Sequence, residues 1–250
     1  MPVIVIAANE LTFDVQGQGE KAMLFVHGIG TDFTIWKQLI DHFSSNFKCY
    51  RFDWKGFGES RLNVASSFAP DILAKELKAI IEELNIKTEF YIIADNAGAL
   101  AALQADISDL VRCKGMVLFN IADKFKVKAK YKQLYKSVLD NTRLKMVEKM
   151  NVKELFEKKQ VIIESWLKDI ASIDMSTGTE YIETPVDIIM GKDNSFVTFK
   201  ECEATVKRIP KSRVTQLDGG DFVMLENASA VIKEIENFIS VFIPGLDKHA

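Results

Sequence analysis

Histidine, the side chain that most often moves protons at neutral pH, occurs three times in this chain of 250 residues, at His27, His42 and His249. His42 falls within a helical pattern, and His249 falls within a polar tail. An imidazole titrates near pH ~6.5, whereas an aspartate titrates near ~3.9 and is a poor base for an alcohol. A reaction that needs a histidine base therefore has few candidates, and His27 stands in a turn rich in glycine.

Two glycine motifs follow consecutive runs that are typical of strands. The apolar run 22–26 leads into His27–Gly30, with the sequence His-Gly-Ile-Gly, and the run 49–52 leads into Asp53–Ser60, with the sequence Asp-Trp-Lys-Gly-Phe-Gly-Glu-Ser. A glycine motif on its own often serves an ordinary turn. Two of them in this order, at consecutive strand ends, are more specific.

With these motifs the chain resembles the α/β-hydrolase superfamily, and the resemblance extends from Leu11 to about Phe242. In that family the backbone N–H groups of the His-Gly turn form half of an oxyanion hole. The resemblance therefore implies an oxyanion hole and pocket that include His27, Gly28 and Ile29, together with Ala97, which follows the nucleophile position.

The family places its nucleophile on a sharp strand-to-helix turn between small residues, and the matching segment here is Ala94–Gly98, with the sequence Ala-Asp-Asn-Ala-Gly. Asn96 stands where serine, cysteine or aspartate would stand, and a carboxamide is no nucleophile. Asparagine tolerates the positive φ of such a turn, so Asn96 can preserve the turn without the chemistry. Asp95 is an alternative nucleophile, as aspartate is in dehalogenases and epoxide hydrolases, although it lies one position from the tip.

The acid and base positions also depart from the family pattern. Where the family has Gly-x-x-Asp, this chain has Gly-Lys-Asp-Asn, so Asn194 stands at the acid position. Asp193 and Asp123 are alternative acids. Where the resemblance implies Gly-His-Phe, the chain has Gly-Asp-Phe, so Asp221 replaces the histidine. We expect Asn96, Asp221 and Asn194, the positions equivalent to a triad, to converge at the carboxyl ends of three strands.

These departures leave three hypotheses about function. The first is a non-hydrolytic pseudo-hydrolase that binds a small molecule or a protein partner. The second is an enzyme of altered chemistry, a lyase, dehydratase, isomerase or cyclase, in which Asp221 is the general acid or base and Asn96 binds a ligand carbonyl or hydroxyl group. The third is a hydrolase with Asp95 as its nucleophile. Serine-hydrolase activity is not expected, and no motif indicates a metal or a cofactor.

The elements that must position these residues alternate between strand and helix patterns. The expected strands are 3–6, 11–15, 22–26, 49–52, 90–93, 116–119, 186–190 and 213–217, and the expected helices are 33–43, 71–84, 97–106, 197–208 and 228–242. This alternation predicts an α/β-hydrolase fold, with a mostly parallel eight-stranded sheet that is antiparallel at its start and has helices on both faces. Residues 1–121 and 185–250 would form its core.

The alternation breaks in residues 122–184, where helix patterns follow one another with no intervening strand. Two apolar stripes, in 131–139 and 152–170, predict a helical cap that packs on the carboxyl edge of the sheet. Residues 124–160 contain twelve Lys or Arg against four Asp or Glu, which is typical of solvated helix faces and also of a surface that contacts a protein partner. We expect a pocket for a small-molecule ligand between core and cap.

The composition makes several other classes of protein improbable. A net charge of -3 and a hydrophobic fraction of 48% suit a globular protein in water. No apolar run approaches the ~18–20 residues that cross a bilayer, and residues 1–8 lack the basic start of a signal peptide. We therefore expect a cytoplasmic protein that binds neither a membrane nor nucleic acid.

Overall fold

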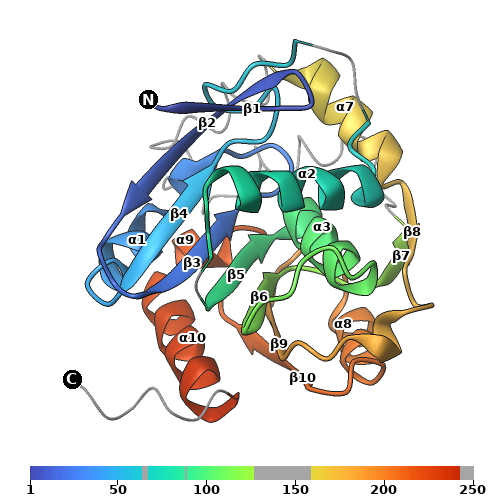
Figure 1. Cartoon of the computed structure of the whole chain (residues 1–250). Coiled ribbons are helices and arrows are strands. Elements are labelled where there is room, and N and C mark those ends of the chain that lie inside the picture. Colours follow the sequence, from blue (N-terminus) through green and yellow to red (C-terminus); the bar gives the residue numbers. More distant parts are fainter. Residues whose placement is uncertain (64–66, 88, 127–158, 243–250) are drawn as a thin grey trace.

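The structure is a computed structural model that describes residues 1–63, 67–87, 89–126 and 159–242, and every structural statement below refers to these residues. Eight strands form one sheet through the molecule, and helices pack against it (Figure 1). The strands of this sheet are β1 (Val3–Ile6), β2 (Asn9–Gln16), β3 (Lys21–Val26), β4 (Phe47–Phe52), β5 (Phe90–Asp95), β6 (Gly115–Phe119), β9 (Val186–Gly191) and β10 (Ser212–Leu217).

The strand order is β1-β2-β4-β3-β5-β6-β9-β10. β1 pairs antiparallel with β2, and β2 pairs antiparallel with β4, whereas all the other pairs are parallel, as predicted. Parallel strands of one sheet end at the same edge, where the ligands of such folds bind. The loops after β3, β5, β9 and β10, which carry the predicted site residues, therefore meet at one carboxyl edge.

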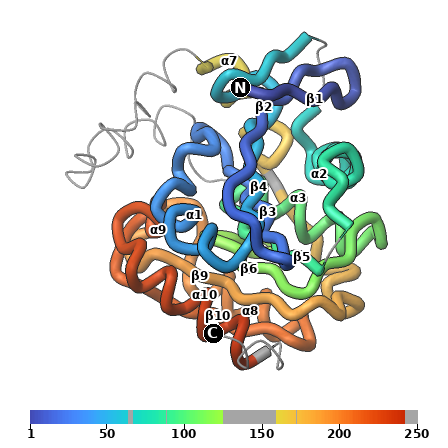
Figure 2. The backbone as a smooth tube through the Cα atoms, turned by 60° about the vertical axis from the view of Figure 1, so that its left-hand side comes forward, coloured from blue at the N-terminus to red at the C-terminus, as the bar shows by residue number. Residues whose placement is uncertain are grey.

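Helices cover both faces of the sheet, as predicted. α2 (Pro70–Glu83) and α3 (Asn96–Ile107) contact each other on one face. α1 (Lys37–Phe43) and α10 (Ala228–Phe242) lie on the other face, as the two sides of the strands in Figure 2 show. The remaining elements of the core are η1 (Phe33–Trp36), α8 (Phe199–Val206) and α9 (Val223–Glu226).

The spacing of apolar residues explains which surfaces are buried. In α2, Leu73, Leu77 and Ile80 recur at three- or four-residue intervals, and all three are buried. β5 is buried along its whole length, as a central strand covered by helices on both faces must be. The elbow that follows β5 therefore stands at the end of a fully buried strand.

Residues 122–184 contain two short strands that the sequence patterns did not predict. β7 (Lys124–Lys126) and β8 (Ser172–Asp174) pair antiparallel in a separate two-stranded sheet, so the expectation of helix following helix without a strand was wrong. Each strand has three residues, which is too short to show a recognisable alternation. η3 (Thr179–Tyr181) then leads back to the main sheet.

α7 (Gln160–Asp169) is the described helix of the expected cap, and it packs near the carboxyl edge of the main sheet. Trp166 is fully buried, and its ring contacts those of Trp54, Phe57 and Phe68. Trp54 and Phe57 belong to the loop after β4, so α7 lies over the carboxyl end of that strand. The first predicted stripe, in 131–139, and most of the basic segment lie outside the described residues, and the limits of the cap stay a prediction.

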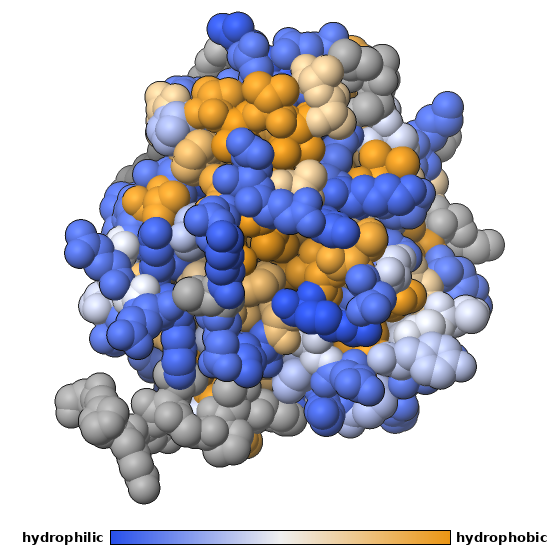
Figure 3. Space-filling view, viewed as in Figure 1, coloured by the Kyte–Doolittle hydropathy of each residue, from blue (hydrophilic) through white to orange (hydrophobic). Residues whose placement is uncertain are grey.

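The first strand is an open edge of the sheet. β1 pairs only with β2 among the described strands, and residues 1–9 carry no charged side chain. Val3 is 49% exposed and Val5 is 64% exposed. Figure 3 shows a hydrophobic area over the part of the molecule that contains β1. No helix in the described ranges has the length and apolar character that crossing a bilayer requires.

Candidate functional site

Asn96 lies at the sharp turn between β5 and α3, at the carboxyl edge of the sheet. Its φ is 48°, which lies in the left-handed region that asparagine tolerates better than most residues. The predicted positive φ is therefore confirmed. The residue is 8% exposed, and no other described residue forms a hydrogen bond with its carboxamide.

The turn after β3 packs directly against this elbow, because two glycines permit a close approach. A Cβ on Gly28 would lie 2.5 Å from Asp95 Oδ2 and 2.9 Å from Asn96 Cβ, and a Cβ on Gly98 would lie 2.5 Å from His27 O. A larger residue at either position would displace the backbone. The glycine turn and the first turn of α3 are thereby held side by side, which is the arrangement on which an oxyanion hole depends.

His27 has a structural role in this turn. Its Nε2 accepts a hydrogen bond from Trp54 N (2.9 Å), so the proton is assigned to Nδ1, which donates to Gly28 O (2.8 Å). The ring is fully buried, and this burial lowers the pKa of His27 to about 4. His27 is therefore neutral at pH 7, and both of its nitrogens are engaged.

Asp221 lies in the loop after β10 and is 8% exposed, so its carboxylate does not point into solvent. Asn194 Nδ2 donates to Asp221 Oδ1 (2.9 Å), Ser195 N donates to the same oxygen (2.7 Å), and Ser195 Oγ donates to Oδ2 (2.6 Å). Burial raises the pKa of Asp221 above its ordinary value, and the hydrogen bonds from Ser195 lower it. The structure thus brings Asp221 and Asn194 into direct contact.

The loop after β9 presents Asn194 in a fixed orientation. Its Oδ1 accepts hydrogen bonds from Phe196 N (3.0 Å) and Val197 N (2.9 Å), so its amide group faces Asp221. The neighbouring Asp193 is exposed. Ser195 could not be predicted from the family pattern, which ends at the preceding residue. The only signal in the sequence was a hydroxyl group next to the acid position.

Asp95 is buried at the base of the elbow. Burial first, and the nearby Asp221 second, raise its pKa well above the ordinary value, while a hydrogen bond from Asn120 lowers it. Its Oδ1 has no hydrogen-bond partner among the described residues. The raised pKa disfavours the ionised carboxylate that a nucleophile requires, which opposes the interpretation of Asp95 as a nucleophile. The described residues contain no cluster of three or more His, Cys, Asp or Glu that could hold a metal ion.

The residue after β6 that lies beside Asp221 is Asn120. Its Nδ2 donates to Asp221 O (2.9 Å). The alternative acid, Asp123, is instead engaged in an ion pair with Arg208 and accepts a hydrogen bond from Thr205 Oγ1 (3.1 Å). The structure therefore assigns Asp123 to an ion pair with the half-buried Arg208 and brings Asn120 to the site. Asn120 could not be predicted from the sequence, because nothing in the family pattern marks an asparagine there.

The second glycine motif closes the loop after β4. Asp53 Oδ1 accepts a hydrogen bond from Phe33 N (2.7 Å), while Ser60 Oγ donates to Asp53 O and accepts from Thr12 N, both at 2.8 Å. A Cβ on Gly58 would lie 1.9 Å from the Asp53 carboxylate, so glycine is required at that position. The first and last polar residues of the motif are therefore structural.

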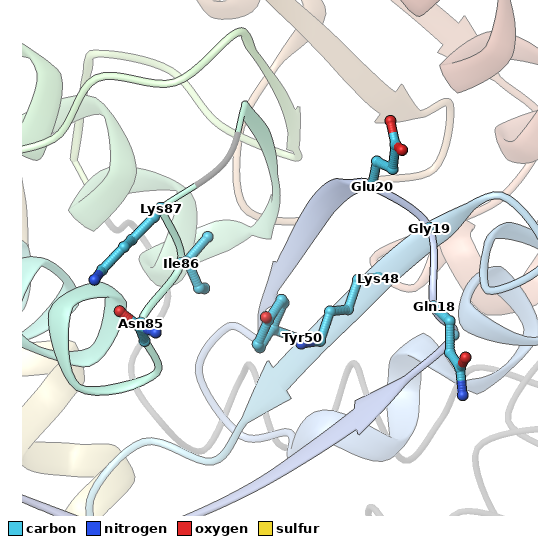
Figure 4. A pocket seen from close by; sticks show the side chains of 9 residues that line it. Gln18, Gly19, Glu20, Lys48, Tyr50, Asn85, Ile86 and Lys87 are labelled. Carbon is cyan, nitrogen blue, oxygen red and sulfur yellow. The ribbon is translucent and has the colours of Figure 1, made fainter.

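A hollow of about 400 Å³ lies at the amino edge of the sheet, opposite to the residues described above. The turn 17–20, Lys48 and Tyr50 of β4, and residues 85–87 line it (Figure 4). Lys48 Nζ lies 5.3 Å from the centre of the Tyr50 ring, whereas the side chains of Lys87 and Glu20 point away from that ring in Figure 4. The charged groups do not converge, and no predicted site residue lines this hollow.

A family model described as "alpha/beta hydrolase fold" matches residues 21–153, just over half of the chain. The chain belongs to the α/β-hydrolase family. Two solved family structures have the same fold: a thermophilic esterase from Thermogutta terrifontis has a TM-score of 0.79 at 19% identity, covering 96% of this chain and 98% of that one. The enol-lactonase from Burkholderia xenovorans LB400 has a TM-score of 0.74 at 16% identity, covering 96% and 100%. At these identities the likeness shows the fold alone.

Plant relatives match a part of this α/β hydrolase. The "Karrikin insensitive 2 receptor CA" of Petunia hybrida is 29% identical over 102 residues, which are 38% of this chain and 36% of the relative. The "Probable esterase D14L" of Oryza sativa subsp. japonica is 29% identical over 101 residues, which are 36% of this chain and 35% of the relative. The match therefore spans about a third of the length of these relatives.

Proposed function

We propose that this α/β hydrolase is a non-hydrolytic pseudo-hydrolase that binds a small molecule at the carboxyl edge of its sheet. One observation carries the proposal. Asn96 occupies the elbow, and Asp221 occupies the loop after β10, where the family pattern has a serine and a histidine. The two positions that would exchange a proton during hydrolysis hold a carboxamide and a carboxylate.

Neither residue can replace the missing chemistry. The Asn96 carboxamide is not a nucleophile, and the Asp221 carboxylate already accepts three hydrogen bonds. His27 cannot act as the base, because its ring is neutral and both nitrogens have partners. In a serine hydrolase, losing the triad as a unit costs on the order of a millionfold in turnover. We therefore expect no ester hydrolysis that routine assays would detect.

Binding is supported by groups that the fold retains. The first N–H groups of a helix have no carbonyl partner within it, and in α3 they lie beside the turn that contains Gly28. The Asn96 side chain adds a donor and an acceptor. These groups suit a neutral ligand with a carbonyl or hydroxyl oxygen. The name of the Petunia relatives, receptors, also favours a small-molecule ligand for this chain.

The test compares ester turnover in matched variants. The purified protein should hydrolyse p-nitrophenyl acetate no faster than Asn96→Ala does. The control is Asn85→Ala, because Asn85 also has a positive φ (53°), so the same backbone strain is introduced outside the site. Turnover that Asn96→Ala abolishes and Asn85→Ala retains would overturn the proposal.

The ligand is sought by native mass spectrometry of the purified protein. We expect a bound neutral compound whose occupancy falls in Asn96→Leu and persists in Asn85→Ala. If no compound is bound, and if a library of neutral lactones and ketones does not raise the melting temperature, the ligand-binding part of the proposal is wrong.

A second candidate is an enzyme in which Asp221 is the general acid or base. The observation that favours it is the burial of Asp221, which raises its pKa toward the range of useful acid–base catalysts. Such an enzyme would exchange protons next to the carbonyl group of a bound ligand. Deuterium exchange followed by NMR should then be lost in Asp221→Asn and retained in Asp193→Asn, the exposed control. Equal exchange in both variants would exclude Asp221.

We also propose that the protein acts in the cytoplasm and that the basic segment 124–160 contacts a protein partner. Cell fractionation tests the location. Charge reversal of lysines in the segment, followed by affinity purification and mass spectrometry, tests the partner.

A further inference from the structure

The geometry points to Asn120 as the positioning residue of the site: its carboxamide holds the main chain of Asp221 and thereby orients the Asp221 carboxylate. This inference rests on the location of the site proposed above, but it does not depend on which ligand binds there or on whether a reaction occurs.

Asn120 joins three strand ends through its own polar atoms. It follows β6 directly and is 2% exposed. Its N donates to Ile189 O (3.1 Å), its Nδ2 donates to Asp221 O (2.9 Å), and its Oδ1 accepts from Gly191 N (3.2 Å). One side chain therefore connects the end of β6, the end of β9 and the loop after β10.

The backbone at this position narrows the choice of residue. The φ of Asn120 is 52°. A non-glycine residue keeps a φ in this left-handed region only when the surrounding structure holds it there. Asparagine and aspartate tolerate such a φ, but an ionised aspartate has no donor for the carbonyl of Asp221. Asparagine combines the tolerated φ with one donor and one acceptor.

The same carboxamide also affects a buried carboxyl group of the site. It lowers the pKa of Asp95, on β5, against the larger effect of burial. The titratable groups that interact electrostatically with the Asp221 carboxylate are Asp95 from β5 and Glu226 from α9. Glu226 Oε2 accepts a hydrogen bond from Gly220 N (2.8 Å). Moving the main chain of Asp221 would change its contacts with Ser195 and Asn194, which depend on where residue 221 is held.

The first test removes the carboxamide while keeping the backbone relaxed. Asn120→Gly is compared with Asn85→Gly, which is the same change at a φ of 53° outside the site. The readout is the amide exchange of Ser195, whose N–H is bonded to Asp221 Oδ1. We expect about a tenfold faster exchange in Asn120→Gly, as losing roughly one hydrogen bond implies, and no change in Asn85→Gly.

The second test separates positioning from general support of the fold. In Asn120→Asp the shape is kept, and the new side chain can donate to Asp221 O only when it is protonated. Ser195 protection relative to wild type at the same pH should therefore be low where the new aspartate is ionised and should recover as the pH falls and it becomes protonated, whereas Asn120→Gly should show no such recovery. If Asn120→Gly does not fold, the isosteric Asn120→Asp carries the test alone.

Unchanged Ser195 protection in Asn120→Gly, or a loss in Asn120→Asp that acid does not restore, would overturn the inference. Neither readout needs a ligand. Ester turnover by the unmodified protein would therefore remove the proposed function and leave this inference standing.

Discussion

Asn96 shows how a single residue can satisfy the backbone of a sharp strand-to-helix turn without supplying a nucleophilic side chain. Its φ of 48° matches what the elbow requires, and the close approach at Gly28 and Gly98 is retained around it. The proposed function can therefore be tested directly by introducing the side chains of the family pattern into this backbone.

Returning one side chain should not restore hydrolysis. Asn96→Ser supplies an oxygen nucleophile without a base, and Asp221→His supplies a base without a nucleophile, so the two changes should be strongly non-additive. The combination of Asn96→Ser with Asp221→His and Asn194→Asp should give a burst of p-nitrophenol, because residue 194 already contacts residue 221. Turnover in either single variant would contradict this reading of the site.

A second prediction at the residue scale concerns Asp187 on β9, which is fully buried and accepts a hydrogen bond from Arg213 Nη2 (2.8 Å). Burial raises the pKa of Asp187 from its ordinary value of 3.8 to about 6, against the effect of Arg213. The folded state then holds the proton more tightly than the unfolded state. The contribution of this group to stability is present below pH ~4 and is lost as the pH rises to about 6.

Asp187→Asn should therefore gain stability relative to wild type between pH 4 and pH 6, on the order of 3 kcal/mol from a shift of about two units. Urea unfolding at several pH values measures this difference. Asp174→Asn is the control: Asp174 is exposed, and its bond to Lys124 lowers its pKa to about 2, so it should show no such trend above pH 4. If the stability difference between Asp187→Asn and wild type does not change between pH 4 and pH 6, Asp187 is ionised over that whole range.

At the scale of elements, a buried cation joins the loop after β4 to α2 and lies next to the cap helix. Lys55 is 0% exposed, and its Nζ donates to Glu76 Oε1 (2.5 Å) and to Ser67 O (2.9 Å). Asp169 of α7 accepts a hydrogen bond from the N–H of Phe68, the residue after Ser67 (2.6 Å). The segment 67–68 is therefore held between the core and α7.

Lys55→Met should destabilise the fold by about 3–5 kcal/mol, because it leaves Glu76 buried without its partner. The double variant Lys55→Met with Glu76→Leu should recover most of this loss, as urea unfolding would show. The control is Lys78→Met on α2, the helix that carries Glu76. The partner of Lys78, Glu82, is exposed, so this variant should change stability by less than about 1 kcal/mol. A similar cost for both lysine variants would mean that the buried pair is not specifically important.

The elements that the sequence predicted well are those with long periodic patterns. α10 has the predicted limits, 228–242, because its apolar residues recur over four turns. The predicted helix 71–84 is observed as α2, displaced by one residue because Pro70 starts it. β7 and β8 were missed, since strands of three residues depend on their partner and not on their own pattern.

At the scale of the whole molecule, the sequence predicted which loops meet but not which atoms meet within them. The parallel order places the ends of β5, β9 and β10 at one edge, so the proximity of Asp221 and Asn194 followed from topology. The contacts of Ser195 and Asn120 depend on the path of two loops in space, and no periodicity encodes that path. The same limit applies to Asp123, whose partner Arg208 lies 85 residues later in the chain.

The open, uncharged edge of β1 has a consequence for handling this protein at high concentration. Natural sheets commonly protect an outer strand with a charge or a proline, because unpaired backbone groups recruit other strands into aggregates. β1 has the sequence Val-Ile-Val-Ile, and its Val3 and Val5 side chains are exposed. A lysine in place of Val5 would act as a gatekeeper residue, and it should lower light scattering during concentration while leaving the melting temperature close to that of the parent chain.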